Sequence, residues 1–242
     1  MPIQRIAVIG ATGMLGRPVT RALIGAGFEV TVVARAPEKA RALFPTASVA
    51  AADVFDASSL ERALAGQDAV YLNLSIDPTE RPEDPHTETD GLDNVIAAAK
   101  ANRLQRIAYL SSLVKEYQGR NGFRWWAFDV KHEAVRRIKA SGLSYTIFYA
   151  STFMETLARD FLRGQWLVLI GTSQHPMYFI AGRDYGRQVA RSFELLDAGE
   201  NREYAVQGPE AYRTEEAARV FAANYARANL WIVRVPLGFV RV

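Results

Sequence analysis

The sequence predicts a doubly wound α/β fold, in which helices cover both faces of a parallel β-sheet. Two observations predict it. Short β-branched segments alternate with longer segments of helical period through the first 150 residues, an order typical of βαβ units. The predicted strands are also apolar along nearly their whole length, as expected for strands that are covered on both faces.

The elements alternate regularly in the first part of the chain and less regularly after it. Strands are expected over residues 3–9, 29–34, 49–52, 69–73, 106–110 and 144–149. Helices are expected over residues 14–27, 37–44, 58–64, 90–102 and 127–141. After residue 150 we expect only helices over 184–197 and 214–226 and a strand over 230–235. We therefore predict one domain over residues 1–242, with the sheet in a core over 1–150 and a small C-terminal substrate lobe over 151–242.

The composition of the 242-residue chain excludes several classes of function. It contains no cysteine, so disulfides, thiolate zinc sites and cysteine nucleophiles are excluded, and three histidines alone give no metal site. The formal net charge is only +3 and basic residues are dispersed among acidic ones, so no nucleic-acid partner is expected. No apolar stretch approaches the roughly 18 residues of a membrane span, and the first residues lack a secretory signal. We expect a cytoplasmic protein with no membrane partner.

A glycine-rich turn, Gly10-Ala-Thr-Gly-Met-Leu-Gly16, follows the first predicted strand. Gly10 ends the strand, Gly13 lets the backbone approach a ligand, and Gly16 lets the next helix lie close to the sheet. The start of that helix presents unpaired N–H groups and a positive dipole end, which suit a pyrophosphate. Tight turns need glycine in many folds, but strand, turn and helix occur here in the order of a Rossmann-like dinucleotide site. The expected cofactor contacts of this turn are Gly10, Thr12, Gly13, Met14, Leu15 and Gly16.

The residue that follows the second strand favours one cofactor over another. An acidic residue at this place would bind the adenosine ribose hydroxyls of NAD, but the sequence has Arg35. A guanidinium pairs with a 2′-phosphate, which a carboxylate would repel, so NADP(H) is preferred and NAD(H) remains open. The alternative is that Arg35 is a solvated surface residue.

Several segments together resemble the NmrA-like, atypical short-chain dehydrogenase/reductase family. They are "GATGMLG", "ADVFDASSLERALAGQDAVYLNLS", "GLDNVIAAAKANRLQRIAYLSS", "KHEAVRRIKASGLSYTIFYASTFME" and "VQGPEAYRTEEAARVFA". The resemblance runs from residue 3 to about residue 226 and implies an NAD(P)-binding domain. It places Asp53 and Val54 beside the adenine and Asn73, Leu74 and Ser75 on the nicotinamide side of the cofactor. For Asp53, the alternative is a cap of a helix or turn.

The catalytic pattern of ordinary short-chain dehydrogenases is incomplete in this chain. Those enzymes use a serine together with Tyr-x-x-x-Lys, in which lysine binds the nicotinamide ribose and lowers the tyrosine pKa. The resemblance aligns Lys131 with the lysine, but Ala127 stands four residues before it. Ser111 and Ser112 match the family's serine position. Ser111 and Lys131 are therefore candidates for both cofactor binding and catalysis, the alternative for Lys131 being a solvent-facing side chain.

Three routes to proton transfer remain without that tyrosine. Lys131 can act as acid or base, as the similar isoflavone-reductase branch implies for its helix lysine. Tyr117 can supply a phenol from the loop after the fifth strand. In the third route, which we rank slightly first, a conjugated acceptor takes hydride at the nicotinamide and its proton from water.

Aromatic residues suggest the kind of substrate. Tyr117, Phe123, Trp125, Trp126 and Phe128 lie close in sequence, and with Phe153, Met154 and Trp166 they would form an apolar pocket for a planar ligand, although packing explains single rings equally well. We expect hydride transfer from NADPH to a small planar aromatic or quinone-like substrate. The alternative is a non-catalytic NAD(P)-binding redox sensor, which the missing tyrosine favours. Nucleotide-sugar epimerases and dehydratases are disfavoured because they need Tyr-x-x-x-Lys. The oligomeric state stays open, a homodimer included.

Overall fold

The computed structural model describes residues 2–76, 79–122, 124–195, 199–226, 229–236 and 238. The chain forms two compact units. The first comprises Met1–Tyr149 and Arg183–Ala205, and the second comprises Ala150–Gly182 and Val206–Val242. In the described residues no helix is both long enough and apolar enough to span a membrane.

A seven-stranded sheet forms the centre of the first unit, in the order β3-β2-β1-β4-β5-β6-β11. Its strands are β1 (Arg5–Ile9), β2 (Glu29–Ala34), β3 (Ser48–Ala51), β4 (Ala69–Leu72), β5 (Arg106–Ser112), β6 (Ser144–Ala150) and β11 (Arg202–Val206). Strand β1 pairs in parallel with β2 on one side and with β4 on the other, and the parallel pairing continues to β3 and to β5. Ile9 is in register with both Val33 and Leu72. The chain reverses its direction of travel across the sheet at β1, which opens a crevice beyond the carboxyl ends of β1 and β4.

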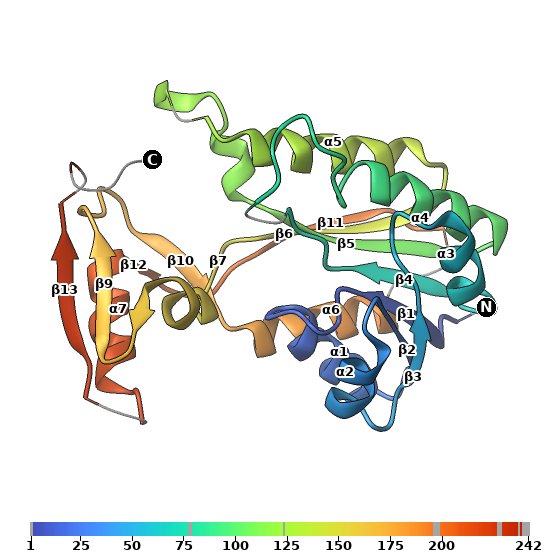
Figure 1. Cartoon of the computed structure of the whole chain (residues 1–242), viewed down its shortest axis with the longest axis horizontal. Coiled ribbons are helices and arrows are strands. Elements are labelled where there is room, and N and C mark those ends of the chain that lie inside the picture. The colour runs from blue at the N-terminus through green and yellow to red at the C-terminus, as the bar shows by residue number, and fades with distance from the viewer. Residues whose placement is uncertain are drawn as a thin grey trace. The chain divides into compact units, whose positions relative to one another are not determined.

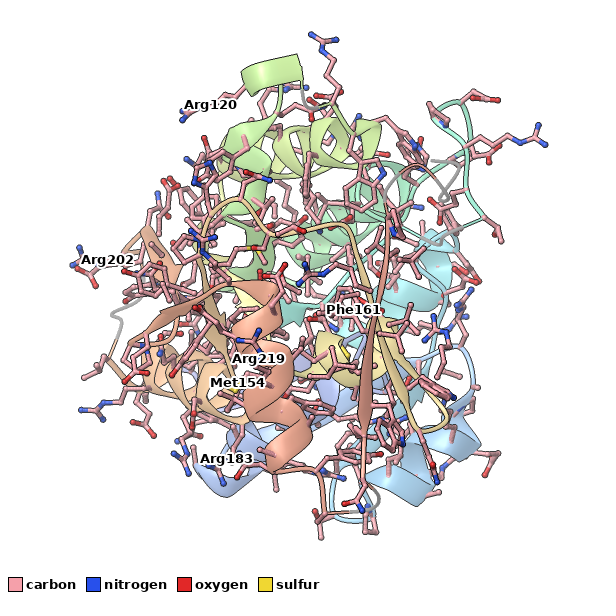
Figure 2. The ribbon with its side chains drawn as sticks, turned by 90° about the vertical axis from the view of Figure 1, so that its left-hand side faces the viewer. Arg120, Met154, Phe161, Arg183, Arg202 and Arg219 are labelled. Atoms are coloured by element: carbon pink, nitrogen blue, oxygen red, sulfur yellow. The ribbon has the colours of Figure 1, made fainter. Side chains whose placement is uncertain are left out.

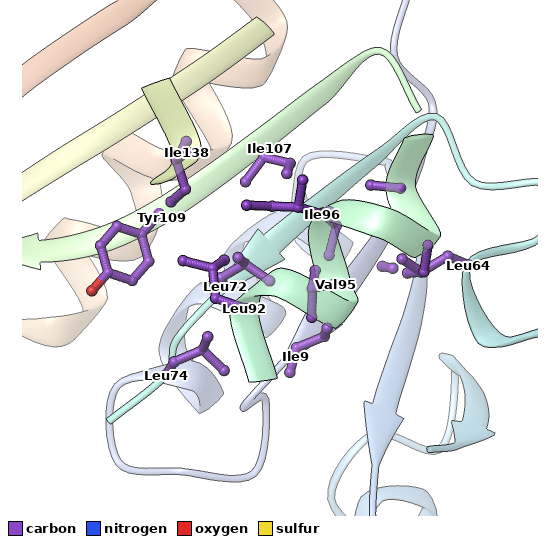
Figure 3. Packing of buried hydrophobic residues seen from close by; sticks show 14 of the residues in the cluster. Ile9, Leu64, Leu72, Leu74, Leu92, Val95, Ile96, Ile107, Tyr109 and Ile138 are labelled. Carbon is purple, nitrogen blue, oxygen red and sulfur yellow. The ribbon is translucent and has the colours of Figure 1, made fainter. Parts of the chain in front are cut away.

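Helices cover both faces of this sheet, so the predicted doubly wound α/β fold is confirmed (Figure 1). The helices are α1 (Gly16–Gly25), α2 (Pro37–Leu43) and α6 (Gly182–Leu195) on one face, and α3 (Ala57–Leu64), α4 (Asp90–Ala101) and α5 (Trp126–Ala140) on the other. A large apolar cluster lies between the sheet and α3, α4 and α5 (Figure 3). Leu72, Leu92 and Ile107 in it are fully buried. This packing fixes the strand ends that form the crevice.

Helix α6 follows residue 150 in sequence but belongs to the first unit. The hydroxyl groups of Tyr185 on α6 and Tyr71 on β4 lie 2.9 Å apart, and the Tyr185 ring packs edge-on against Phe148 of β6. Strand β11, which we did not predict, completes the sheet beside β6. The range 151–242 expected for the C-terminal lobe therefore includes residues of the first unit. The predicted end of α6 at residues 196–197 lies outside the described residues.

The second unit contains two small sheets and one α-helix. One sheet has the order β12-β10-β7 and the other β13-β9-β8. The elements are β7 (Thr152–Phe153), β8 (Leu162–Arg163), β9 (Trp166–Ile170), β10 (Met177–Ile180), β12 (Ala211–Tyr212), α7 (Thr214–Ala223) and β13 (Trp231–Val235), with a π-helical turn over Leu157–Phe161. Leu167 and Leu169 of β9 pack against Ala218 of α7. Figure 2 faces this unit and labels Met154 and Phe161 in it.

Candidate cofactor and active site

The glycine-rich turn between β1 and α1 has no room for side chains at two of its glycines. Gly10 has a φ of +83°, which L side chains rarely adopt, and a Cβ there would overlap the carbonyl oxygen of Asn73. A Cβ at Gly16 would overlap the Gly10 carbonyl oxygen. Gly13 is exposed, and its N–H donates to the Gly10 carbonyl at 3.2 Å. The turn therefore holds its backbone directly against the ends of β1 and β4.

The start of α1 is suited to an anion. Its N-cap residue, Leu15, makes no side-chain capping bond, and its first turn contains no acidic residue. Arg17 donates from Nε to the Thr12 carbonyl at 2.9 Å, which ties the helix to the turn before it. Uncapped N–H groups at a helix start, with no carboxylate nearby, match the requirements of a pyrophosphate.

A cavity of about 340 Å³ lies over the crevice of the first unit. Eight of the predicted cofactor contacts line it, namely Gly10, Thr12, Arg35, Asp53, Val54, Asn73, Leu74 and Ser75. Gly13, Met14, Leu15 and Gly16 are outside its lining and belong to the turn and the helix start. Ser111 and Lys131, which we also predicted as cofactor contacts, are outside the lining too. The carboxyl ends of β1, β2, β3 and β4 thus bring together residues that are far apart in sequence.

Two cations line the same cavity beside the end of β2. Arg35 is exposed, and so is Lys39 on α2, which we did not predict. Neither forms an ion pair within the described part of the chain, whereas Arg41 on the same helix pairs with Glu38 at 2.5 Å. Unpaired guanidinium and ammonium groups at a cavity wall are available to a phosphate.

Asp53 and Asn73 also have structural partners. The Asp53 carboxylate accepts a hydrogen bond from the Phe55 N–H at 3.0 Å. Asp53 therefore caps a turn, as the alternative interpretation of this residue predicts. Asn73 donates from its main-chain N–H to the Ile9 carbonyl at 3.0 Å and from its amide Nδ2 to Gly10 at 3.5 Å. Their contacts with a cofactor stay predictions.

Lys131 is bound to a buried carboxylate that we did not predict. Its Nζ donates to Glu88 Oε1 at 2.7 Å, and the Tyr109 hydroxyl donates to the same oxygen at 2.5 Å. The Glu88 side chain is 0% exposed and that of Lys131 is 20% exposed. Burial, and then the neighbouring Glu88 carboxylate, raise the pKa of Tyr109 well above its usual value.

Ser111 and Ser112 have different surroundings at the end of β5. Ser112 Oγ accepts from the Val114 N–H at 3.1 Å and so caps the following turn. Ser111 is 3% exposed, and its Oγ is buried with no hydrogen-bond partner in the described residues. It lies two residues after Tyr109 and so faces the same side of the sheet. Of the two serines, Ser111 retains a free hydroxyl for a ligand.

Tyr117 is separate from this group. It lies in the 3₁₀ turn Val114–Tyr117 and is 58% exposed. Its ring lies 5.7 Å from the guanidinium of Arg120, which is labelled in Figure 2. In the described structure no interaction joins it to Lys131 or Ser111.

The predicted aromatic pocket is distributed over both units. Trp125 and Phe128 pack edge-to-face with ring centres 4.9 Å apart, and the Trp126 ring lies 5.0 Å from His86. Phe123 lies outside the described residues. Phe153, Met154 and Trp166 belong to the second unit, where Met154 lines an apolar cavity of about 330 Å³. The described residues contain no group of acidic residues and histidines that could hold a metal ion.

Glu88, Tyr109 and Lys39 are the residues that sequence reasoning missed. Tyr109 lies in an apolar strand, so the sequence pattern predicts only a buried packing residue there. Glu88 lies just before the predicted helix over 90–102, where acidic residues are common for capping reasons. Lys39 could have been predicted as a second cation of the phosphate site, because it lies four residues after Arg35.

The glycine turn, the cavity and the sheet order define a dinucleotide-binding α/β protein with a reductase-like fold. The family model described as NAD(P)H-binding matches residues 10–163, so the chain belongs to the NAD(P)H-binding family and its cofactor is a nicotinamide dinucleotide. These matches, together with the solved structures that are similar to it, confirm the resemblance to NmrA-like, atypical short-chain dehydrogenases/reductases.

Three known proteins illustrate the range of the similarity. A (4-alkanoyl-5-oxo-2,5-dihydrofuran-3-yl)methyl phosphate reductase of Streptomyces griseus is 33% identical over 87% of this chain and 70% of its own length. The photosystem II assembly factor Ycf39 of Cyanophora paradoxa is 28% identical over 98% of this chain and 73% of its own. The crystal structure of the NADPH-dependent quinone oxidoreductase QOR2 of Escherichia coli, complexed with NADPH, is 25% identical with a TM-score of 0.73, over 96% of this chain and 78% of that one.

Proposed function

We propose that the protein is an NADPH-dependent reductase of small planar, aromatic or quinone-like acceptors. The observation that carries the proposal is the cavity of the first unit, with two cations in its wall that form no ion pair among the described residues. The similar quinone oxidoreductase of Escherichia coli binds NADPH, and the similar Streptomyces griseus protein is a reductase. Both support a reductase over other activities of this fold.

The residues around the cavity fit NADPH. The glycine turn and the start of α1 would hold the pyrophosphate, because a Cβ at Gly10 or Gly16 would close the turn. Arg35 and Lys39 would pair with the 2′-phosphate, and Asp53 and Val54 would lie beside the adenine. Asn73, Leu74 and Ser75 would face the nicotinamide half.

The reaction asks little of the protein beyond binding and one proton. When bound, NADPH supplies a hydride to the acceptor. Lys131 can donate a proton through Nζ, or the proton can come from water. Ala127 is 3% exposed, so the position of the usual tyrosine contributes only packing. A conjugated acceptor suits such a site, because the charge that it gains is delocalised.

The test combines turnover with cofactor affinity. NADPH oxidation is followed with a panel of quinones and aromatic dyes. Arg35→Ala should weaken NADPH binding by about 1.5–3 kcal/mol, or roughly ten- to a hundredfold, and leave NADH binding unchanged. Arg41→Ala is the matched control, since Arg41 lies on α2, which begins just after Arg35, and is paired with Glu38. Unchanged NADPH affinity in Arg35→Ala would contradict the 2′-phosphate assignment.

A second candidate is a non-catalytic protein that binds the same cofactor and regulates or assembles a protein partner. The missing tyrosine at Ala127 favours it, and the similar Cyanophora paradoxa protein is an assembly factor. Tight NADPH binding without turnover of any acceptor in the panel would support this candidate and reject the reductase.

A further inference from the structure

Glu88 directly follows a residue of the wall of the cofactor cavity. Thr87, the residue before it, lines that cavity and donates from its hydroxyl to the Ser75 carbonyl at 2.9 Å. The Glu88 side chain is buried and accepts hydrogen bonds from Lys131 of α5 and Tyr109 of β5. The neighbouring residues Thr87 and Glu88 therefore connect the cavity wall to the hydrogen-bonded group of Glu88, Lys131 and Tyr109.

The buried carboxylate of Glu88 needs compensating groups beside it. A carboxylate with no exposed surface is stable as an anion only when a cation or several donors compensate it. Oε1 receives both donors, while Oε2 is buried with no hydrogen-bond partner in the described residues. Lys131 is the one cation bonded to Glu88 in the described part of the chain. Loss of its proton would leave the carboxylate uncompensated.

Tyr109 supports the carboxylate but cannot replace Lys131 as a proton donor. Its side chain is completely buried, so no substrate reaches its hydroxyl. Burial also raises its pKa, which keeps it a neutral hydrogen-bond donor. Lys131 differs because one-fifth of its side chain is exposed.

We propose that Glu88 is a positioning residue, which fixes the Lys131 amino group through their hydrogen bond and holds it as an ammonium ion. Lys131 then acts as an acid and not as a neutral base. This role in turnover rests on the proposed reductase function, whereas the effect of Glu88 on the charge of Lys131 does not.

The proton balance follows from this assignment. The acceptor gains a hydride from NADPH and becomes an anion, usually on oxygen. An N–H bond of Lys131 breaks as the O–H bond of the product forms. The neutral amine then regains a proton from water through its exposed part. Each turnover consumes one NADPH, one proton and one acceptor.

The test measures the charge of Lys131 without requiring turnover. Only a neutral amine reacts with formaldehyde and cyanoborohydride, so the rate of Lys131 methylation is followed against pH by peptide mass spectrometry. In Glu88→Gln, which keeps the shape of the side chain, we expect methylation near pH 8 to be at least about tenfold faster than in the wild type. The methylation-rate profile of Glu88→Gln should move to lower pH. Glu88→Asp keeps the charge, so its profile should lie close to that of the wild type.

A matched control separates this effect from general loosening. Asp93 on α4 forms an ion pair with Arg137 of α5 at 2.5 Å, so Asp93→Asn also removes a carboxylate that contacts α5. It should leave the Lys131 profile unchanged. Equal profiles in wild type and Glu88→Gln, or an equal shift in Asp93→Asn, would overturn the proposal. If the Glu88→Gln profile shifts but no acceptor is reduced, the positioning role stands and the reductase function fails.

Discussion

The first unit carries cations in two different settings. Arg35 and Lys39 are exposed in the cavity wall and have no ion-pair partner in the described residues. Lys131 is mostly buried and bonded to the Glu88 carboxylate. An unpaired, exposed cation is available to an incoming anion, whereas a cation beside a buried carboxylate neutralises a charge of the chain itself. The proposed function uses the first pair for cofactor recognition and the second setting for the reaction.

Lys115 shows that a buried, paired lysine alone is not enough to suggest chemistry. Its side chain is 4% exposed and contacts Glu116, with His132 Nδ1 at 3.3 Å and the Tyr149 ring at 4.9 Å. The carboxylate here is 55% exposed, so water shares in compensating it. The lysine at position 131 differs because its carboxylate has no exposure at all.

The largest expected effect separates the two settings by closing the glycine turn of the cofactor cavity. Gly16→Ala places a Cβ against the Gly10 carbonyl, so we expect a loss of about 1–3 kcal/mol of unfolding free energy and of about a hundredfold in NADPH affinity. Chemical denaturation and cofactor titration measure the two losses. The pH profile of Lys131 methylation should stay as in the wild type.

Gly25→Ala is the control for this change. Gly25 is the last residue of the same helix, and a Cβ there meets nothing within 4 Å. Alanine should stabilise the helix by about 0.5–1 kcal/mol with no change in affinity. If Gly16→Ala changed stability and NADPH affinity no more than Gly25→Ala does, the turn would not be the pyrophosphate site that we propose.

An alkaline titration of the tyrosines has the next largest effect and reports on the buried setting. Burial raises the pKa values of Tyr71, Tyr109 and Tyr185 above the usual value. Their neutral forms are favoured by folding, so this contribution to stability is complete below about pH 10 and is lost as the pH rises further. The absorbance of these tyrosinates should appear together with unfolding. Their ionisation in the native protein, before any loss of circular dichroism, would contradict the buried cluster.

The alternating pattern was sufficient to predict the core of the fold. Strands β1 to β6 and helices α1 to α5 lie where apolar runs and helical periods place them. Strand β11 was missed because Arg202, Glu203 and Ala205 on it are exposed and leave no apolar run. The return of α6 to the first unit depends on the contact of Tyr185 with Tyr71, which are 114 positions apart.

The two settings of the site differed in how far sequence could predict them. The residues that line the cavity at the strand ends were predictable, because the carboxyl ends of parallel strands meet at one edge of a sheet. Glu88 was not, because glutamate is almost never fully buried unless paired and its partner is 43 positions away. No local pattern announces such a pair.

The smallest expected effect concerns Tyr117, which remains a predicted alternative proton donor. It is 58% exposed, and no described interaction connects it with Lys131, so Tyr117→Phe should change kcat with a quinone less than about twofold. Tyr109→Phe is the informative comparison. It removes a bond to a carboxylate, about 1.5–3 kcal/mol of stability, and leaves Lys131 to compensate Glu88 alone. A tenfold or greater loss of kcat in Tyr117→Phe would identify the exposed phenol as the proton donor. The charged Lys131 would then serve only to bind the cofactor.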